Sequence, residues 1–229
     1  MSHYAVAVFH RADQDINELL APYDENLEVE PYIQYSREEA IEYAKQWYKT
    51  DGKSDEECWK LVAEDRETDG EGNIYTTYNP QSKWDWWQEG GRWADMLKLK
   101  SGKYADSARV CDIDFSPDDE VYQRSLRFWD VVVEHKPKEE GEDFFTIYNE
   151  QYYRDFYNDR ESYARQQAAF STYAVVTPDG EWHAPGEMGW FGCSSESGDE
   201  SIDWYSHYKE CFIDAADPDW ILTIVDCHI

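Results

Sequence analysis

Tyr4-Ala-Val-Ala-Val-Phe9, close to the N-terminus, is the stretch that decides the fold. Aromatic and small apolar residues alternate along it, which is the pattern of a β-strand. Trp220 to Val225, close to the other end, predicts a second buried strand. Strands at both ends with helical patterns between them predict an α+β fold, in which an antiparallel or mixed sheet contains both terminal strands and is covered by several helices. A split β-α-β core is the topology that we expect.

Capping signals mark where the helices begin. Ser-x-x-Glu capping boxes occur at Ser36 to Glu39, Ser54 to Glu57 and Ser197 to Glu200. Ser116 and Pro117 predict another start, with Ser116 as the N-cap and Pro117 at the first helical position. Aromatic residues from Thr146 to Phe170 recur at helical spacing and predict one long helix, broken near Asn158.

Short strands are predicted where apolar residues stand between turn residues. They are Glu28 to Tyr35, Ile74 to Tyr78, Met96 to Leu99, Thr172 to Val176 and Glu181 to His183. Thr177-Pro-Asp-Gly180 joins the last two as a hairpin turn. The length of 229 residues, with 17% aromatic residues, is enough to bury one core. We therefore expect a single compact domain over residues 1–229; the alternative is a tightly packed subdivision into residues 1–110 and 111–229.

The charge of the chain is strongly negative, at -29, because 50 Asp and Glu oppose 21 Lys and Arg. After Arg165 the only Lys or Arg is Lys209, and twelve acidic residues lie between Ser171 and Ile229. Such a surface repels phosphate backbones, so we expect no direct nucleic-acid binding. It attracts basic proteins, which makes a basic protein the expected partner; plain solubility is the alternative explanation of the charge.

The cysteines and the hydropathy indicate a cytoplasmic location without a membrane contact. The five cysteines are scattered and form no CxxC pair, as expected for reduced thiols: Cys58, Cys111, Cys193, Cys211 and Cys227. The N-terminal residues lack the basic region of a signal peptide, and no apolar run is long enough to span a bilayer.

Motifs for a cofactor, a metal ion or catalysis are weak. The chain has no P-loop, no GxGxxG after a strand and no GxSxG. A calcium-loop pattern begins at Asp65 but has Thr76 where a bidentate Glu is needed, so we expect no metal and no cofactor. An enzyme that uses Cys193 or His183 ranks third among our functional hypotheses.

Residues 79–93 form the densest group of aromatic and basic side chains. Its candidate binding residues are Lys83, Trp84, Trp86, Trp87, Arg92 and Trp93. Indole rings can stack on a base, arginine can bind a phosphate, and Gly90-Gly91 permits close backbone approach or an anion-binding nest. The alternative is that the tryptophans belong to the core.

Asn79-Pro80, Ser82-Lys-Trp-Asp-Trp86 and Gly90-Gly-Arg-Trp93, in this order, resemble a motif of uncharacterised proteins from phages and related mobile elements of Gram-positive hosts. Gly186-Glu-Met-Gly-Trp-Phe-Gly192 resembles a second segment of such proteins. The resemblance implies a virus-encoded accessory protein in a bacterial cytoplasm and assigns no activity.

The loop from Gly186 to Gly198 is the second candidate binding segment. Trp190 and Phe191 stand between Gly189 and Gly192, where both rings are hard to bury, so at least one is expected to be exposed. Closing the end of the sheet is the alternative role. Asp199, Glu200 and Asp203 would supply an acidic rim to this surface.

The sequence therefore leads to two main functional hypotheses. The first is a non-enzymatic, phage-type accessory protein that inhibits a basic host protein, for example one of antiviral defence, through an acidic and aromatic surface that mimics DNA. The second is a protein that sequesters a nucleotide with the tryptophans and cations of residues 83–93.

Overall fold

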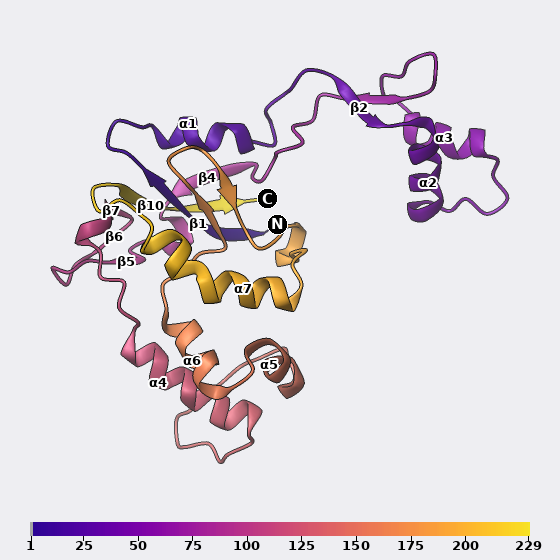
Figure 1. Ribbon diagram of the computed structural model, residues 1–229. Helices are drawn as coiled ribbons and strands as arrows, with labels where there is room; N and C mark the ends of the chain where they lie inside the picture. Colours follow the sequence, from indigo (N-terminus) through magenta and orange to yellow (C-terminus); the bar gives the residue numbers. More distant parts are fainter. Residues whose placement is uncertain (1) are drawn as a thin grey trace. The chain divides into compact units, whose positions relative to one another are not determined.

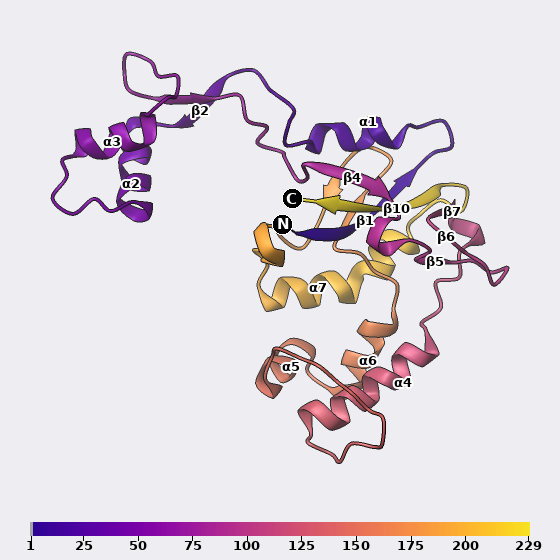
Figure 2. The same cartoon turned by 180° about the vertical axis from the view of Figure 1, so that it is seen from behind.

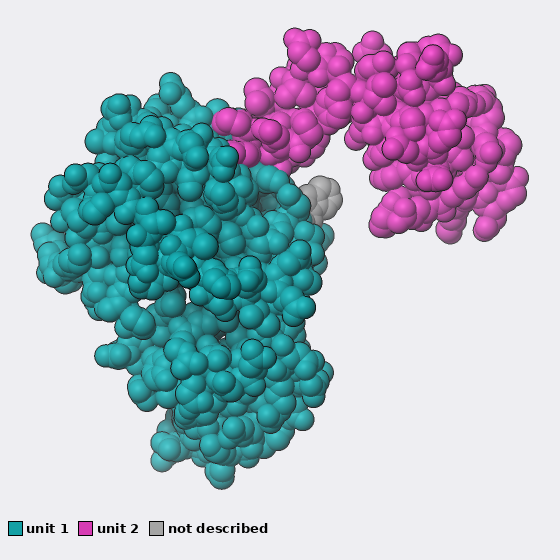
Figure 3. Space-filling model, viewed as in Figure 1, with its two compact units in different colours: residues 1–21, 83–229 teal, residues 22–82 magenta. Residues whose placement is uncertain are grey.

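The computed structural model describes residues 2–229, and the side chain of Trp190 lies outside this description. The chain forms two compact units (Figure 3). Unit 1 contains the residues up to Ala21 together with Lys83–Ile229, and unit 2 contains Pro22–Ser82. Unit 2 is thus an insertion within the sequence of unit 1. The alternative boundary between residues 110 and 111 falls inside unit 1.

A mixed sheet lies at the centre of unit 1 (Figure 1). Its strand order is β4 (Trp86–Glu89), β10 (Ile221–His228), β1 (His3–His10), β8 (Ala174–Val176) and β9 (Trp182–His183), and β7 (Ser107–Arg109) also pairs with β10. The predicted α+β fold, with both terminal strands in one sheet, is therefore confirmed.

The first and last strands form the central pair of the sheet. They are antiparallel over their full length, from His3 opposite His228 to His10 opposite Ile221. Strand β8 runs parallel to β1, and β4 runs antiparallel to β10. Since β10 is antiparallel to both neighbours, β1 and β4 run parallel with β10 between them. This is the arrangement of a split β-α-β unit.

The core of unit 1 covers both faces of this central pair, because almost every residue of β1 and β10 is buried. On one face Phe9, Leu222 and Ile224 pack against Tyr208 and other residues of the last helix. That helix, α7 (Gly198–Tyr208), starts at the predicted capping box and continues into a π-helical turn, Lys209–Ile213. It lies between the sheet and three further helices of unit 1 (Figures 1 and 2).

These three helices are α4 (Asp119–Phe128), α5 (Glu150–Tyr157) and α6 (Arg160–Ala168). The predicted break is confirmed, since Asn158 has a positive φ of 60° between α5 and α6. The predicted start of α4 is wrong. Asp118 is the N-cap, because its carboxylate accepts two backbone N–H groups of the first turn, whereas the Ser116 hydroxyl binds Asp114.

Unit 2 has its own small core. Strands β2 (Tyr32–Tyr35) and β3 (Ile74–Thr76) pair antiparallel and are shorter than predicted. Helices α2 (Arg37–Trp47) and α3 (Asp55–Ala63) both begin at the predicted capping boxes. The buried residues of this core are Ala40, Ala44, Cys58, Val62 and Ile74.

The remaining elements of unit 1 are short. Helix α1 (Ile16–Leu20) follows β1, and β5 (Leu97–Lys98) pairs with β6 (Tyr104–Ala105). All five cysteines are free thiols. Among the described residues, no helix has both the length and the apolar composition that crossing a membrane requires.

Candidate functional site

Two histidines and a tryptophan meet on one face of the central sheet. His3 on β1 lies opposite His228 on β10, and His228 lies opposite Trp86 on β4. Directly paired residues of antiparallel strands project to the same face. The two imidazole centroids are 4.9 Å apart, and the Trp86 ring stacks on His228 at 5.4 Å and 17°.

A fully buried carboxylate holds the first histidine. His3 Nδ1 lies 2.8 Å from Asp226 Oδ1. The other oxygen of Asp226, Oδ2, accepts the backbone N–H of Arg92 at 3.0 Å. Because Asp226 is bonded at both oxygens, its position and that of the His3 ring are fixed.

A second carboxylate holds the second histidine. His228 Nδ1 lies 2.5 Å from Asp85 Oδ1, and the backbone N–H of Asp85 donates to the carbonyl of His228 at 2.9 Å. Within residues 2–229, neither His3 Nε2 nor His228 Nε2 has a hydrogen-bond partner. In each ring Nδ1 is therefore bound to a carboxylate and Nε2 has no partner among these residues, as in the His–Asp part of a catalytic triad.

The glycine pair of the predicted segment lets the backbone pass close to the carboxylates of Asp226 and Asp106. Gly90 and Gly91 have positive φ values of 66° and 55°. A Cβ on Gly91 would lie 2.5 Å from Asp226, and one on Gly90 would lie 2.5 Å from Asp106. The close backbone approach expected from the sequence thus occurs, and the anion received there is the chain's own Asp226 carboxylate.

The second predicted segment is joined to the same end of the sheet. The Ser2 hydroxyl donates to the carbonyl of Gly189 at 2.5 Å and accepts the N–H of Gly192 at 2.7 Å. Lys83 Nζ forms an ion pair with Glu187 at 2.6 Å. The two predicted binding segments therefore contact each other, and the second also contacts Ser2, the residue that precedes β1.

The four tryptophans predicted to bind a ligand do not line one pocket. Trp84 is buried, and Trp93 packs against the core of the sheet. Trp86 is 41% exposed, whereas its neighbour Trp87 lies opposite Cys227 on the other face. The hypothesis of a nucleotide site in residues 83–93 required these rings to line one pocket, and they do not. The Arg92 side chain is exposed and makes no ion pair within the described part of the chain.

The predicted acidic and aromatic surface residues are exposed. Phe191 is 83% exposed and has a positive φ of 61°; the side chain of Trp190 is not described. Asp199, Glu200 and Asp203 lie at the start of α7. Glu200 also closes the capping box with Ser197, and these hydrogen bonds lower the pKa of its carboxyl.

The sequence analysis missed His3, Asp85, Asp226 and His228. They come from three distant segments, and no linear motif joins them. One signal was available: the strand predicted to end at Val225 extends to His228 in the structure, and the spacing Asp226-x-His228 in a strand places both side chains on one face. The third hypothesis gains no support, because no hydrogen bond joins Cys193 to His183 among residues 2–229.

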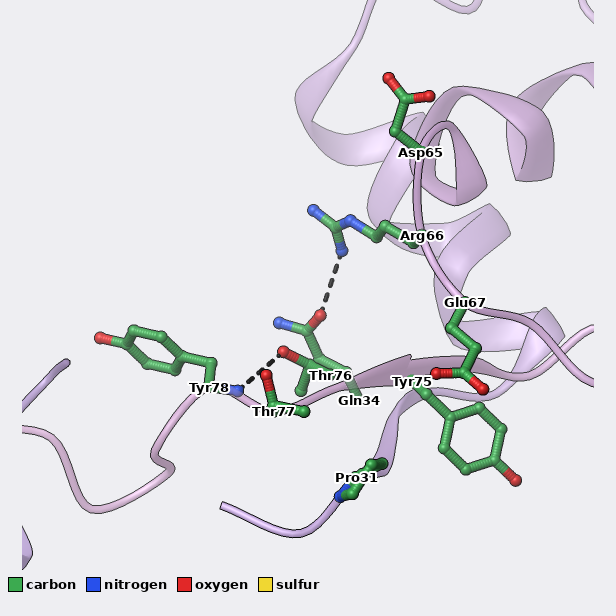
Figure 4. Close-up of a pocket in the computed structure, with 9 residues that line it drawn as sticks. All are labelled: Pro31, Gln34, Asp65, Arg66, Glu67, Tyr75, Thr76, Thr77 and Tyr78. Carbon is green, nitrogen blue, oxygen red and sulfur yellow. Dashed lines mark hydrogen bonds between the residues drawn. The ribbon is translucent and has the colours of Figure 1, made fainter. Parts of the chain in front are cut away.

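Unit 2 contains a separate cavity of about 440 Å³ beside β3 (Figure 4). Its wall includes Asp65, Arg66 and Glu67, and the Arg66 guanidinium donates to the Gln34 side chain at 3.1 Å. Among the described residues, no group of three or more His, Cys, Asp or Glu is arranged to hold a metal ion. The pair of histidines in unit 1, whose ring centroids lie 4.9 Å apart and which each bind a carboxylate, is the stronger candidate site.

Comparison of the chain with protein-family models, with curated proteins and with solved structures gives no match.

Proposed function

We propose that the protein is an acid–base enzyme that cleaves a small ester, with a phosphodiester as the favoured substrate. The observation that carries the proposal is the pair of adjacent imidazoles, His3 and His228, each bound through Nδ1 to a carboxylate. Two histidines in opposite protonation states can act together on one bond.

The chemistry needs no nucleophile from the protein. The neutral imidazole takes the proton of an attacking water or of a hydroxyl group of the substrate. The protonated imidazole gives its proton to the leaving oxygen as the bond to that oxygen breaks. After this step the imidazole that was neutral carries a proton, and the imidazole that was protonated has lost one. Proton exchange with water then restores the initial state of both rings.

The surroundings of the histidines favour a small anionic substrate with a flat group. Trp86 offers an exposed ring beside His228, and Arg92 offers a guanidinium without an ion pair. The net charge of -29 disfavours long nucleic acids. A single phosphodiester, such as that of a cyclic nucleotide, fits both conditions.

The test is a hydrolysis assay of the full chain with bis(4-nitrophenyl) phosphate and with 2′,3′-cyclic nucleotides. We expect His3→Gln and His228→Gln each to lower the rate by roughly 100-fold or more. His207→Gln is the matched control, because His207 is an exposed histidine on α7. No turnover by folded wild type, or equal rates in all variants, would contradict the proposal.

Binding to a basic host protein is a second candidate function. It is supported by Phe191, whose ring is 83% exposed shortly before the acidic start of α7. Exposed aromatic rings with an acidic rim suit a basic partner. The resemblance to phage proteins favours a protein of the bacterial host as that partner.

A pull-down from a bacterial lysate at low and high salt tests the second function. We expect a basic protein to be retained only at low salt. The triple change Asp199→Asn, Glu200→Gln and Asp203→Asn should reduce its retention, and glutamine can still close the capping box at position 200. Retention that is independent of both salt and these changes would count against an acidic binding surface.

A further inference from the structure

A cavity of about 390 Å³ lies between the end of α5, helix α6 and helix α7. Eleven residues line it, and none of them is acidic although the chain contains 50 Asp and Glu. Its polar and aromatic lining residues include Tyr157, Ser162, Arg165, Gln166, Tyr205 and Lys209. All of them belong to unit 1 and none belongs to the histidine site.

The cavity gathers the cations of the C-terminal part of the chain. Between Glu161 and Ile229, Arg165 and Lys209 are the only Lys and Arg, and both line this cavity. They come from different helices, α6 and the turn that follows α7, so their convergence results from the fold. Against a negative surface, two cations without a lining carboxylate create a local site for an anion.

Three other cavities among residues 2–229 lack this property. The cavity in unit 2 contains Asp65 and Glu67, and the cavity beside the β8–β9 hairpin contains Asp179 and Glu181. The cavity beside α4 contains Asp143. An anion would meet a carboxylate in each of these three.

Arg165 is available for a ligand. Its guanidinium donates to Ser162 Oγ at 3.1 Å and forms no ion pair with any residue in 2–229. Lys209 forms an ion pair with Asp214, which lies five residues further along the chain and does not line the cavity. A guanidinium can bind two oxygens of a phosphate side by side, and the ammonium group adds a second charge.

The aromatic wall is rigid. The Tyr157 ring packs edge-on against Tyr163 with ring centroids 4.9 Å apart, and Tyr163 is a buried residue of α6. Burial raises the pKa of Tyr157 and of Tyr205, so both hydroxyls stay neutral and can donate a hydrogen bond. A fixed aromatic wall beside two cations suits a ligand that has a flat base and a phosphate.

We propose that this cavity binds a mononucleotide, with its phosphate on Arg165 and Lys209 and its base beside Tyr157 and Tyr205. A volume of about 390 Å³ is in the range of small-molecule sites. The negative surface around the cavity disfavours a longer nucleic acid. This site is independent of the acid–base site.

Isothermal titration of the full chain with ADP, AMP and pyrophosphate at low salt tests the proposal. We expect one nucleotide per chain, and we expect Arg165→Gln and Lys209→Gln each to weaken ADP binding by at least about 10-fold. Lys138→Gln, at an exposed lysine outside the cavity, is the matched control and should bind as wild type does. Far-ultraviolet circular dichroism checks that the variants are folded.

Two results would overturn the proposal: no nucleotide binding by folded wild type, or binding that is unchanged in Arg165→Gln. Pyrophosphate binding as tight as ADP binding would also overturn it, because the base would then contribute nothing. His228→Gln should lower ester cleavage by roughly 100-fold or more and leave ADP binding intact. The experiment therefore distinguishes failure of the cavity proposal from failure of the acid–base proposal.

Discussion

His3 on the first strand and His228 on the last strand lie directly opposite each other, with ring centroids 4.9 Å apart. Each ring turns Nδ1 toward a carboxylate, Asp226 for His3 and Asp85 for His228. The site therefore exists only when β1 and β10 are paired, and its formation reports the assembly of the central sheet.

Asp85 is a positioning residue, and its removal should affect turnover more than binding. In Asp85→Asn the amide cannot hold the His228 ring as the carboxylate does, so we expect kcat to fall by roughly 100-fold with little change in KM. Steady-state kinetics on the cyclic nucleotide measure both constants. Asp112→Asn, at an exposed carboxylate paired with Arg109, should leave them unchanged. A rise in KM alone would assign Asp85 to substrate binding.

Gly91 should tolerate no side chain. In Gly91→Ala the new Cβ would lie 2.5 Å from Asp226 in a backbone with positive φ, so both contact and conformation oppose it. We expect the free energy of unfolding to fall by about 3 kcal/mol, measured with urea. Gly102→Ala has the same backbone strain with open space around it and should cost only about 1 kcal/mol. Equal losses would show that contact with Asp226 is unimportant.

Asn79 closes the base of unit 2. Its side-chain amide is buried and donates to the carbonyls of Pro22 and Asp24 at 2.7 and 2.9 Å. Asn79→Ala leaves these carbonyls without a donor, so we expect unit 2 to lose about 1–3 kcal/mol of stability. Limited proteolysis should then cut first within residues 22–82, whereas Asn17→Ala, at an exposed asparagine, should not alter the pattern. Unchanged cleavage would contradict this role.

Acid should weaken the contact between α6 and the π-helical turn Trp129–Val133. Hydrogen bonds and ion pairs with Arg160 and Lys136 lower the pKa of Asp130 to about 2. A folded-state pKa below the unfolded value means that this stabilisation is complete above about pH 4 and is lost as the pH falls toward 2.

The urea midpoint between pH 2 and pH 6 measures this effect. Wild type should exceed Asp130→Asn in stability at pH 6, and the difference should shrink below pH 3. A difference that stays constant over this range would show that the charge of Asp130 does not contribute.

Local patterns in the sequence predicted most of the fold. Some signals depend only on residues close together in the chain. They are the alternation from Tyr4 to Phe9 and the capping boxes at Ser36, Ser54 and Ser197. The structure contains the strand and the three helices that these signals predict. The predicted start of α4 at Ser116 was wrong because Ser116 and Asp118 can both serve as an N-cap, and Asp118 accepts two backbone N–H groups.

The candidate site depends instead on strand register. Period-two alternation shows which residues share a face of a strand, but it does not show which residue of another strand lies opposite. His3, Asp85 and His228 become neighbours only through the pairing of β1, β10 and β4. The role of the Trp84 to Trp93 segment in binding stays a prediction, and its position beside Asp226 follows from long-range pairing that the segment does not encode.

Unit 2 begins at Pro22 and ends at Ser82, and the Asn79 amide holds the start and the end of this insertion together. An insertion closed at its own base can be inherited as a cassette. Recombination can then remove, lengthen or exchange it without changing the pairing of β1 with β10. In a lineage under pressure to vary, residues 22–82 are where new surfaces can arise while the histidine pair is kept.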